Sequence, residues 1–322
     1  MKLLIRILPV IFALLSCTVD SGKTDQTGGR SNKPPVIINI HGANALYPLA
    51  QIWADHYMSG HPGVRIIVFP ASSTKGKTDV MNGLADIGMY SNPSPDGIGD
   101  SLLLLKVAKD AVMPTVNDQN PDLQILVRQG ISPGIFKDIF VNGTITYWNQ
   151  VTGAQTGKKI AVYSRSDLSG AGTVWAEFLG TKQENLIGTG VYGDAGMTQA
   201  IKSNVNSIGY DNLRYIFDHI SGKPYPGIAT LPIDFNNNRI VDPEEAGFAS
   251  LESMKNAIHS GAFPSPLARE LYFIINSGNC STQALDFLTW VLTEGLSDID
   301  KSGYVSLSAE EYESEKMKLK VP

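Results

Sequence analysis

Apolar and polar positions repeat along the chain with two different periods. Short runs rich in Val, Ile, Leu and Tyr predict strands over residues 36–42, 64–69, 85–91, 123–127, 159–165, 207–212 and 271–276. Apolar residues three or four positions apart predict helices over residues 45–60, 132–143, 172–180, 196–204, 252–261 and 280–295. Strands that alternate with helices in this way are typical of an α/β fold.

Three of the connections from a strand to a helix are rich in Gly, Ala, Ser, Thr and Asn. They are "NIHGANALYPL" (39–49), "ASSTKGKT" (71–78) and "VYSRSDLSGAGTVWAEF" (162–178). The first N–H groups of a helix have no partner inside it, and they attract anions. For each connection alone, N-capping through Ser, Thr or Asn is the more common explanation. The three together predict a site for an anion.

The second connection also resembles the beginning of a P-loop, because a Lys-Thr pair follows a glycine between a strand and a helix. A P-loop NTPase therefore stays open as an alternative. That function would require Lys77 and Thr78 to bind Mg·ATP in the cytosol. A hydrolase is a weaker alternative, since none of the five histidines lies in a recognisable catalytic or metal motif.

The first residues predict export from the cytosol. Residues 1–17 have two early cations and an apolar run from Ile7 to Leu15 that is too short to span a bilayer, as in a secretion signal. The stretch that ends at Cys17 resembles the bacterial lipobox, and an ordinary cleaved signal is the alternative. Residues 18–35 are almost free of apolar side chains and predict a flexible tether. We expect a protein anchored by lipid at Cys17 on the extracytoplasmic side of the cell envelope.

Composition adds three limits. Lipidation of Cys17 would leave Cys280 without a disulfide partner, so Cys280 is expected to be a packing residue. A net charge of −5 gives no reason to bind nucleic acid. The chain beyond the tether is long enough for a core in more than one lobe.

Several segments together carry a family resemblance. They include "KDIFVNGTITYWNQV", the Arg-x-Asp pattern followed by Ser-Gly in "SRSDLSG", "SIGY" and the ending "GYVSL". In this order the chain after residue 36 resembles the phosphate-binding proteins of bacterial ABC uptake systems, the PstS-like proteins.

The resemblance implies a two-lobed, type II periplasmic-binding-protein fold that closes over one oxyanion in a cleft between the lobes. It places the crossings between lobes near 112–114 and 264–271, which gives lobe I as 36–113 plus 265–322 and lobe II as 114–264. It implies a monomer, inorganic phosphate or a related oxyanion as ligand, and an ABC permease as partner. It implies no chemistry on the ligand and no required cofactor. A sensor or a surface adhesion lipoprotein on the same fold stays open.

The resemblance also assigns the ligand site. The implied oxyanion ligands are Asn44, Ala45, Ser73, Ser91, Arg165, Ser169, Gly170, Ala171, Gly172 and Thr173. Asn44 stands where the family has Thr, and a carboxamide donates a hydrogen bond as a hydroxyl does. Ser72 or Thr74 replaces Ser73 if the register shifts. Asp167 matches the carboxylate that holds the arginine. Two extra residues before Thr173 leave the assignment within 169–173 open.

One position departs from the family. Ser91 stands where the family has an aspartate that accepts a hydrogen bond from the protonated ligand. A carboxylate rejects a fully ionised anion such as sulfate, and serine does not. We therefore expect weak discrimination between phosphate and sulfate unless Asp96 or another carboxylate enters the site. Lys75 and Lys77 are expected to form a positive rim.

A second possible site follows the spacing of calcium loops. Residues with oxygen ligands stand at positions 1, 3, 5, 7, 9 and 12 of a twelve-residue loop, in the order Asp234, Asn236, Asn238, Ile240 through its carbonyl, Asp242 and Glu245. Position 6 is Arg239, where such loops have glycine. A structural calcium ion and an ordinary surface turn that leads into a helix remain alternatives.

Overall fold

A computed structural model describes residues 34–92, 99, 101–155, 157–246 and 250–320. The predicted signal, Cys17, most of the tether and Asp96 lie outside these residues. Residues from Pro34 onward group into one unit. Within the described ranges, no helix is both long enough and apolar enough to cross a membrane.

The strands of the described ranges form a mixed sheet in the order β2-β1-β3-β9-β4-β7-β5-β6, and β8 also pairs with β4. Their bounds are β1(Val36–Ala43), β2(Val64–Ala71), β3(Ile87–Tyr90), β4(Leu102–Val116), β5(Ala161–Arg165), β6(Thr189–Val191), β7(Ser207–Asn212), β8(Ala229–Thr230) and β9(Ala268–Asn276). β1 pairs in parallel with β2 and β3, and β5 pairs in parallel with β6 and β7. β9 runs antiparallel to both of its neighbours, β3 and β4.

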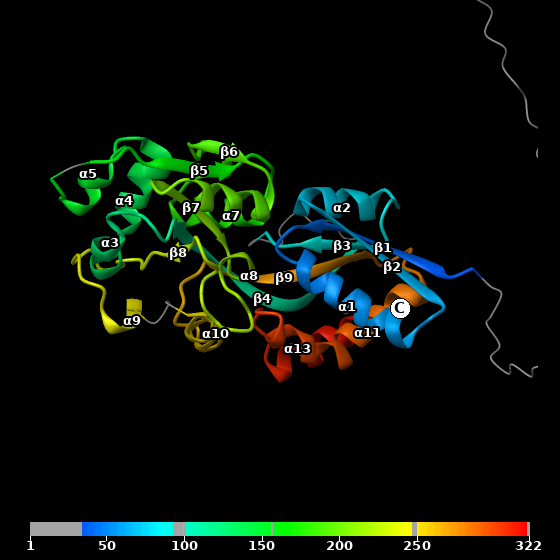
Figure 1. The fold of residues 1–322 in the computed structure, drawn as a ribbon. Coiled ribbons are helices and arrows are strands. Elements are labelled where there is room, and N and C mark those ends of the chain that lie inside the picture. Colours follow the sequence, from blue (N-terminus) through cyan, green and yellow to red (C-terminus); the bar gives the residue numbers. More distant parts are fainter. Residues whose placement is uncertain (1–33, 93–98, 100, 156, 247–249, 321–322) are drawn as a thin grey trace, which may run out of the picture. The chain divides into compact units, whose positions relative to one another are not determined.

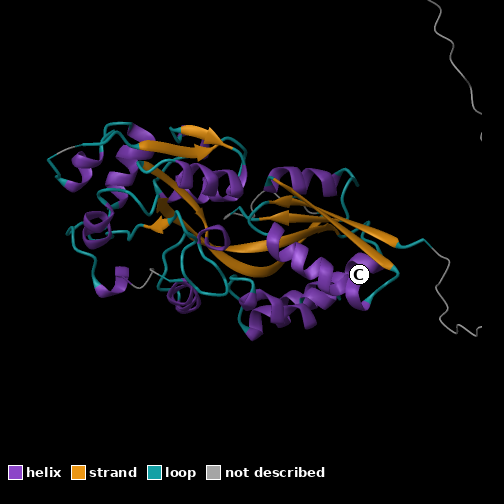
Figure 2. Ribbon diagram, in the orientation of Figure 1, coloured by secondary structure: helices purple, strands orange, loops and turns teal. Residues whose placement is uncertain are grey.

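The helices lie on both faces of these strands (Figure 2). The α-helices are α1(Tyr47–Gly60), α2(Ser73–Met81), α3(Leu123–Gln129), α4(Pro133–Lys137), α5(Trp148–Thr152), α6(Gly170–Phe178), α7(Gly193–Ser203), α8(Leu213–Ile216), α9(Pro243–Ala246), α10(Leu251–Ser260), α11(Thr282–Val291), α12(Ser297–Lys301) and α13(Ala309–Lys318). A π-helical turn η1(Asp138–Asn142) continues α4. Two 3-10 turns are η2(Gln183–Asn185) and η3(Glu294–Leu296).

The long strand β4 belongs to two parts of the sheet. Its residues 102–111 pair with β9, and its last five residues pair with β7. Leu105, Val107 and Ala108 of β4 belong to one large hydrophobic core, and its side chains from Ala111 belong to another. Leu102 and Leu104 lie in a smaller cluster. The described residues thus form two large cores that share a strand, in an α/β fold as predicted. The predicted lobe boundaries themselves stay a prediction.

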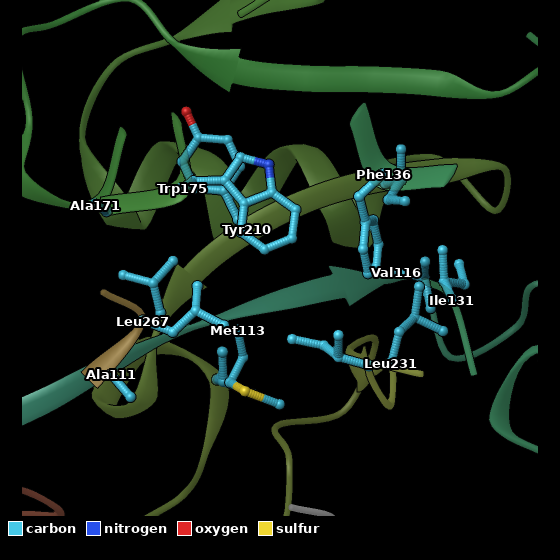
Figure 3. Close-up of a cluster of buried hydrophobic side chains, with 14 of the residues drawn as sticks. Ala111, Met113, Val116, Ile131, Phe136, Ala171, Trp175, Tyr210, Leu231 and Leu267 are labelled. Carbon is cyan, nitrogen blue, oxygen red and sulfur yellow. The ribbon is translucent and has the colours of Figure 1, made fainter. Parts of the chain in front are cut away.

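The core around β7 is built on aromatic contacts (Figure 3). Trp175 of α6 stacks on Tyr210 of β7 with ring centroids 5.5 Å apart. Phe136 and Phe140 contact the Trp175 ring edge to face. Because all four rings are buried, α6 and β7 are held in fixed positions relative to each other.

The other core lies between β1–β3 and the helices α1 and α11, while α2 covers the opposite face of these strands (Figure 1). Trp53 of α1 is fully buried, and its indole N–H donates to the carbonyl of Gly295 at 2.8 Å. Cys280 is half-buried against this core, and burial raises the pKa of its thiol to about 11. The expected packing role of Cys280 is therefore confirmed.

Most predicted elements are confirmed, but the sequence prediction missed several short elements and the helix α13. Three further differences are informative. The run 123–127 was predicted as a strand but forms α3, because a five-residue apolar run has no clear period and the next residue that can end it is Gly130, at a φ of 66°. The sequence prediction missed β4, whose fifteen residues show no clean alternation of buried and half-buried positions. Helix α2 begins at Ser73, earlier than the sequence indicated.

Candidate functional site

A small polar cavity lies where the strands of both cores end. It is lined by Ala43, Asn44, Ala45, Ala71, Ser72, Ser73, Ser91, Arg165, Ser169, Gly170, Ala171, Asp194 and Asn212. These residues end or directly follow β1, β2, β3, β5 and β7, or begin α2, α6 and α7. Ligands of α/β proteins bind at such carboxyl ends of strands. The cavity is small, well below the roughly 300–1,000 Å³ of pockets that hold larger organic ligands.

The loop after β1 supplies unpaired donors. The Nδ2 of Asn44 is buried and has no hydrogen-bond partner in the described part of the chain. The backbone N–H of Ala45 likewise makes no hydrogen bond to any described residue. Two tyrosines hold the backbone of this loop. The Tyr215 hydroxyl donates to the carbonyl oxygen of Asn44 at 3.2 Å, and the Tyr304 hydroxyl donates to that of Ala45 at 2.7 Å. The loop therefore presents two donors from a held backbone.

Ser73 at the start of α2 and Ser91 after β3 meet at the cavity. Ser73, the first residue of α2, accepts a hydrogen bond at its Oγ from the backbone N–H of Ser91, at 3.0 Å. The two hydroxyls are 3.3 Å apart, and both residues are buried. Ser72 caps α2 by accepting from the N–H of Lys75, so its hydroxyl is engaged. Ser72 and Ser73 thus both line the cavity, and the choice of Ser73 as the oxyanion ligand stays a prediction.

Arg165 ends β5 with a side chain that is only 2% exposed. Its Nε donates to Asp167 Oδ1 at 2.8 Å, and its Nη2 donates to Asp167 Oδ2 at 2.6 Å. Its Nη1 donates to Asp194, the second residue of α7. Burial alone would lower the pKa of Arg165, but the charges of Asp194 and Asp167 raise it above its ordinary value. A guanidinium has five N–H groups, so two of them are left for a ligand.

Asp167 lies behind Arg165 and is not among the residues that line the cavity. Its Oδ1 also accepts the backbone N–H of Gly193 at 3.1 Å. Burial raises the pKa of Asp167, but the hydrogen bonds and charge of Arg165 bring it below its ordinary value. Asp167 therefore orients Arg165, which is the role that the resemblance implied.

The start of α6 provides backbone donors. Gly170 and Ala171 line the cavity at the first two helical positions, where N–H groups have no partner inside the helix. The N–H of Gly172 is taken by the Oγ of Ser169 at 2.9 Å, and the Oγ1 of Thr173 donates to the carbonyl of Ser169 at 3.0 Å. Gly172 and Thr173 are not among the lining residues. Of the predicted stretch 169–173, Ser169, Gly170 and Ala171 line the cavity, and which of them would bind an oxyanion stays a prediction.

Two polar lining residues were missed from the sequence, Asp194 and Asn212. Asn212 ends β7, is 1% exposed, and accepts at its Oδ1 from Arg269. Its Nδ2 is buried without a partner in the described residues. Asn212 is the last residue of the predicted strand 207–212, and this place was the available signal, because ligands bind at the carboxyl ends of strands.

Buried charges behind the cavity have perturbed pKa values. Burial raises the pKa of Asp211 well above its ordinary value, and the charge of Asp194 adds to this. Burial also raises the pKa of Asp110 to about 6, although Arg269 lies 3.7 Å from its Oδ2. Arg269 in turn donates from Nη1 to the carbonyl of Ser91 at 2.9 Å, which ties β9 to the cavity wall.

A family model described as a PBP superfamily domain matches residues 25–294. The chain belongs to the PBP superfamily. Among its relatives, the "Phosphate-binding protein PstS" of Methanocaldococcus jannaschii is 27% identical, with 90% of this chain and 86% of the relative covered. The protein of the same name from Pseudomonas aeruginosa is 24% identical over 83% of this chain and 82% of the relative.

Solved structures confirm the fold of this superfamily member. A protein from Clostridium perfringens, described as a phosphate ABC transporter substrate-binding protein and solved with bound phosphate, superposes with a TM-score of 0.67. The two are 22% identical, with 84% of this chain and all of the other covered. An ABC-type phosphate transport receptor from Vibrio cholerae superposes with a TM-score of 0.61 at 20% identity, over 84% of this chain and all of the receptor.

The P-loop resemblance of "ASSTKGKT" is explained by packing in this PBP-superfamily chain. Gly76 and Lys77 lie inside α2, whereas a P-loop places such residues before its helix. A Cβ at Gly76 would lie 2.6 Å from the carbonyl oxygen of His41, so the glycine allows α2 to approach β1. Lys75 pairs with Asp79 on the same helix, and Asp79 also contacts His41 Nδ1 at 2.8 Å. The expected positive rim is therefore partly neutralised.

The predicted calcium loop is closed by its own hydrogen bonds. Asp234 accepts from the backbone N–H groups of Asn238 and Arg239, and Glu245 accepts from those of Phe235 and Asp242. Arg239 has a φ of 62°, so it forms the sharp turn that glycine usually makes. Across the described residues, no group of three or more His, Cys, Asp or Glu side chains is placed to hold a metal ion. Calcium stays a prediction.

Proposed function

We propose that this protein captures inorganic phosphate, or a closely similar tetrahedral oxyanion, in the cavity at the ends of its strands. It would deliver the anion to the permease of an ABC transporter. The observation that carries the proposal is the set of donors that converge on one small cavity: the Asn44 and Asn212 amides, the Ala45 and helix α6 backbone, and Arg165.

The chemistry of the cavity favours an anion that has many acceptors. Unpaired buried donors cost free energy, and a ligand that accepts their hydrogen bonds recovers it. Hydrogen bonds to a charged partner are about twice as strong as neutral ones. Phosphate offers four oxygens in a tetrahedral arrangement, which suits donors that come from several directions. The names of the relatives, which describe phosphate-binding proteins, support the same ligand.

The polar groups of the cavity suit binding. Among the described residues its lining includes neither histidine nor cysteine nor lysine, and the hydroxyls of Ser73 and Ser91 lie next to each other and to a backbone N–H. We therefore propose binding without chemistry on the ligand. We also propose that the protein acts outside the cytosol as a monomer, with a lipid anchor at Cys17 as the sequence indicates. A calcium ion at 234–245 is not needed for this function.

Calorimetric titration of the purified protein with phosphate tests the proposal. We expect the wild type to bind one phosphate, and Asn44→Ala to bind it about tenfold to a hundredfold more weakly, because one hydrogen bond to a charged group is lost. Arg165→Lys keeps the charge that Asp167 and Asp194 require but loses the planar fork, and it should weaken binding at least as much.

Lys202→Ala is the matched control. Lys202 lies in another cavity, together with Arg214 and Tyr225, where a phosphate attracted by positive charge alone would bind. Its removal should leave the affinity for phosphate unchanged. The absence of phosphate binding by the wild type would contradict the proposed function, and so would a loss of binding in Lys202→Ala with none in Asn44→Ala.

A further inference from the structure

We propose that Asp194 makes the site selective for a protonated oxyanion, by accepting a hydrogen bond from the ligand's own hydroxyl group. Phosphate has such a group near neutral pH, and sulfate has none. This inference rests on the proposed function, since it assigns a role inside the same cavity.

The position of Asp194 is the first observation. It lies in the first turn of α7, is 2% exposed, and lines the cavity. Helix α7 packs against β5 and β7, and the preceding N–H of Gly193 is bonded to Asp167. The carboxylate is therefore buried at a fixed place beside the ligand.

The second observation is that Asp194 has acceptor capacity left over. Its Oδ1 accepts from Arg165 Nη1. Its Oδ2 makes no hydrogen bond with any residue that the structure describes, although an ionised carboxylate oxygen accepts up to two. This oxygen can accept a further hydrogen bond, and within the cavity the donor has to come from the ligand or from water.

The third observation is the contrast with the rest of the lining. Asn44 and Asn212 present donors, as do the backbone groups at Ala45 and at the start of α6. A ligand with acceptors alone would satisfy these donors and then place an oxygen against Asp194, where lone pairs would face lone pairs. A ligand with acceptors and one O–H group satisfies both. Hydrogen phosphate has this pattern.

Charge in the site points the same way. Arg165 pairs with both Asp167 and Asp194, so one guanidinium faces two carboxyl groups. Asp211 lies behind them, and Asp110 and Arg269 form a further pair. Positive charge in the lining therefore does not attract phosphate and sulfate alike. The match of hydrogen-bond donors and acceptors has to decide between the two anions.

The sequence led to the opposite expectation, because Ser91 occupies the position of the family's aspartate. The condition attached to that expectation was the absence of another carboxylate, and Asp194 lines the same cavity as Ser91. The carboxylate here comes from the start of a different helix. We therefore replace the expected weak discrimination with strong discrimination.

Titration of the wild type and of Asp194→Asn with phosphate and with sulfate tests the inference. The wild type should bind phosphate at least about a hundredfold more tightly than sulfate. Sulfate has no hydroxyl group, so it would leave the Asp194 carboxylate without a donor, and an unpaired buried charge costs binding free energy. Asp194→Asn keeps the shape and removes the acceptor charge, so its preference should fall at least about tenfold, chiefly through tighter sulfate binding.

Asp167→Asn is the matched control. Asp167 also pairs with Arg165 but does not line the cavity, so this change should weaken both anions and leave their ratio unchanged. An equal loss of both anions in Asp194→Asn would show a positioning role alone and overturn the inference. A wild-type preference near one would also overturn it. If the wild type binds no phosphate, the proposed function itself fails.

A measurement on the wild type alone covers the case in which Asp194→Asn does not fold. Fluorophosphate keeps the tetrahedral shape and double charge of phosphate but has no hydroxyl group near neutral pH. The wild type should bind it as weakly as it binds sulfate. Binding of fluorophosphate as tight as that of phosphate would overturn the role of Asp194.

Discussion

Asp110 is a fully buried carboxyl group whose ionisation opposes folding. Burial raises its pKa to about 6 from an ordinary value of 3.8. Its Oδ1 accepts the N–H of Leu213 at 3.3 Å, and Arg269 lies near its Oδ2. The native state therefore holds a proton on Asp110 at pH values where the unfolded chain has already released it, so unfolding free energy falls as pH rises through this window.

The pH dependence of stability checks this effect. Between about pH 4 and pH 6, Asp110 should lower the free energy of unfolding by about 3 kcal/mol in total, and above pH 6 its effect should be constant. Asp110→Asn lacks the titration. The difference in unfolding free energy between the wild type and Asp110→Asn, from urea denaturation across this range, should therefore change in favour of the variant as pH rises. A difference that is constant with pH would show that Asp110 ionises normally.

Some residues that line the cavity could be predicted from the sequence, and others could not. Ser73, Arg165 and Ser169 follow strands in small-residue connections, and the sequence assigned them before the structure placed them at one cavity. Asp194 carries no such local signal, because it reaches the cavity only through the packing of α7 on β5 and β7. Its role depends on a tertiary arrangement that no local pattern encodes.

At the scale of elements, α2 packs directly against the strands β1 and β3, with Gly76 at the contact. A Cβ at Gly76 would lie 2.9 Å from Gly42 Cα and 3.0 Å from the carbonyl oxygen of Met89. These are backbone atoms, so they cannot rotate away. The glycine therefore sets the depth at which α2 lies, and with it the position of Ser73 at the start of that helix.

We expect Gly76→Ala to destabilise the protein by about 1–3 kcal/mol, because overpacking forces backbone shifts. This loss would occur although alanine favours helix more than glycine does. Gly196→Ala in α7 is the control, since a Cβ there meets nothing within 4 Å, and it should stabilise by up to about 1 kcal/mol. Urea denaturation of both variants measures the effect. Equal effects of the two changes would mean that α2 does not depend on this contact.

Helices and strands were predicted correctly where the pattern of apolar and polar residues repeats over a long segment. Helix α1 and strands β1, β2 and β7 follow the sequence pattern closely. The segment 123–127 failed because five apolar residues fit either period. Strand β4 was missed because it passes from one core to the other, and its second half is buried on both faces instead of alternating.

At the scale of the molecule, the cavity joins the two cores. Asn44, Ser73 and Ser91 reach it from the strands β1–β3 and from α2, while Arg165 and Ser169 reach it from β5 and α6. A ligand that binds both sets holds the two cores together. Binding should consequently stabilise the whole fold, by about 2.7 kcal/mol when the free phosphate is at a hundred times its dissociation constant.

The most direct test of this account is a crystal structure of the protein grown with phosphate. We predict density for one tetrahedral anion in the cavity, in hydrogen-bond contact with both Ser73 and Arg165, with one of its oxygens beside Asp194. A cavity without an anion at saturating phosphate, or an anion bound elsewhere with Arg165 untouched, would contradict the account.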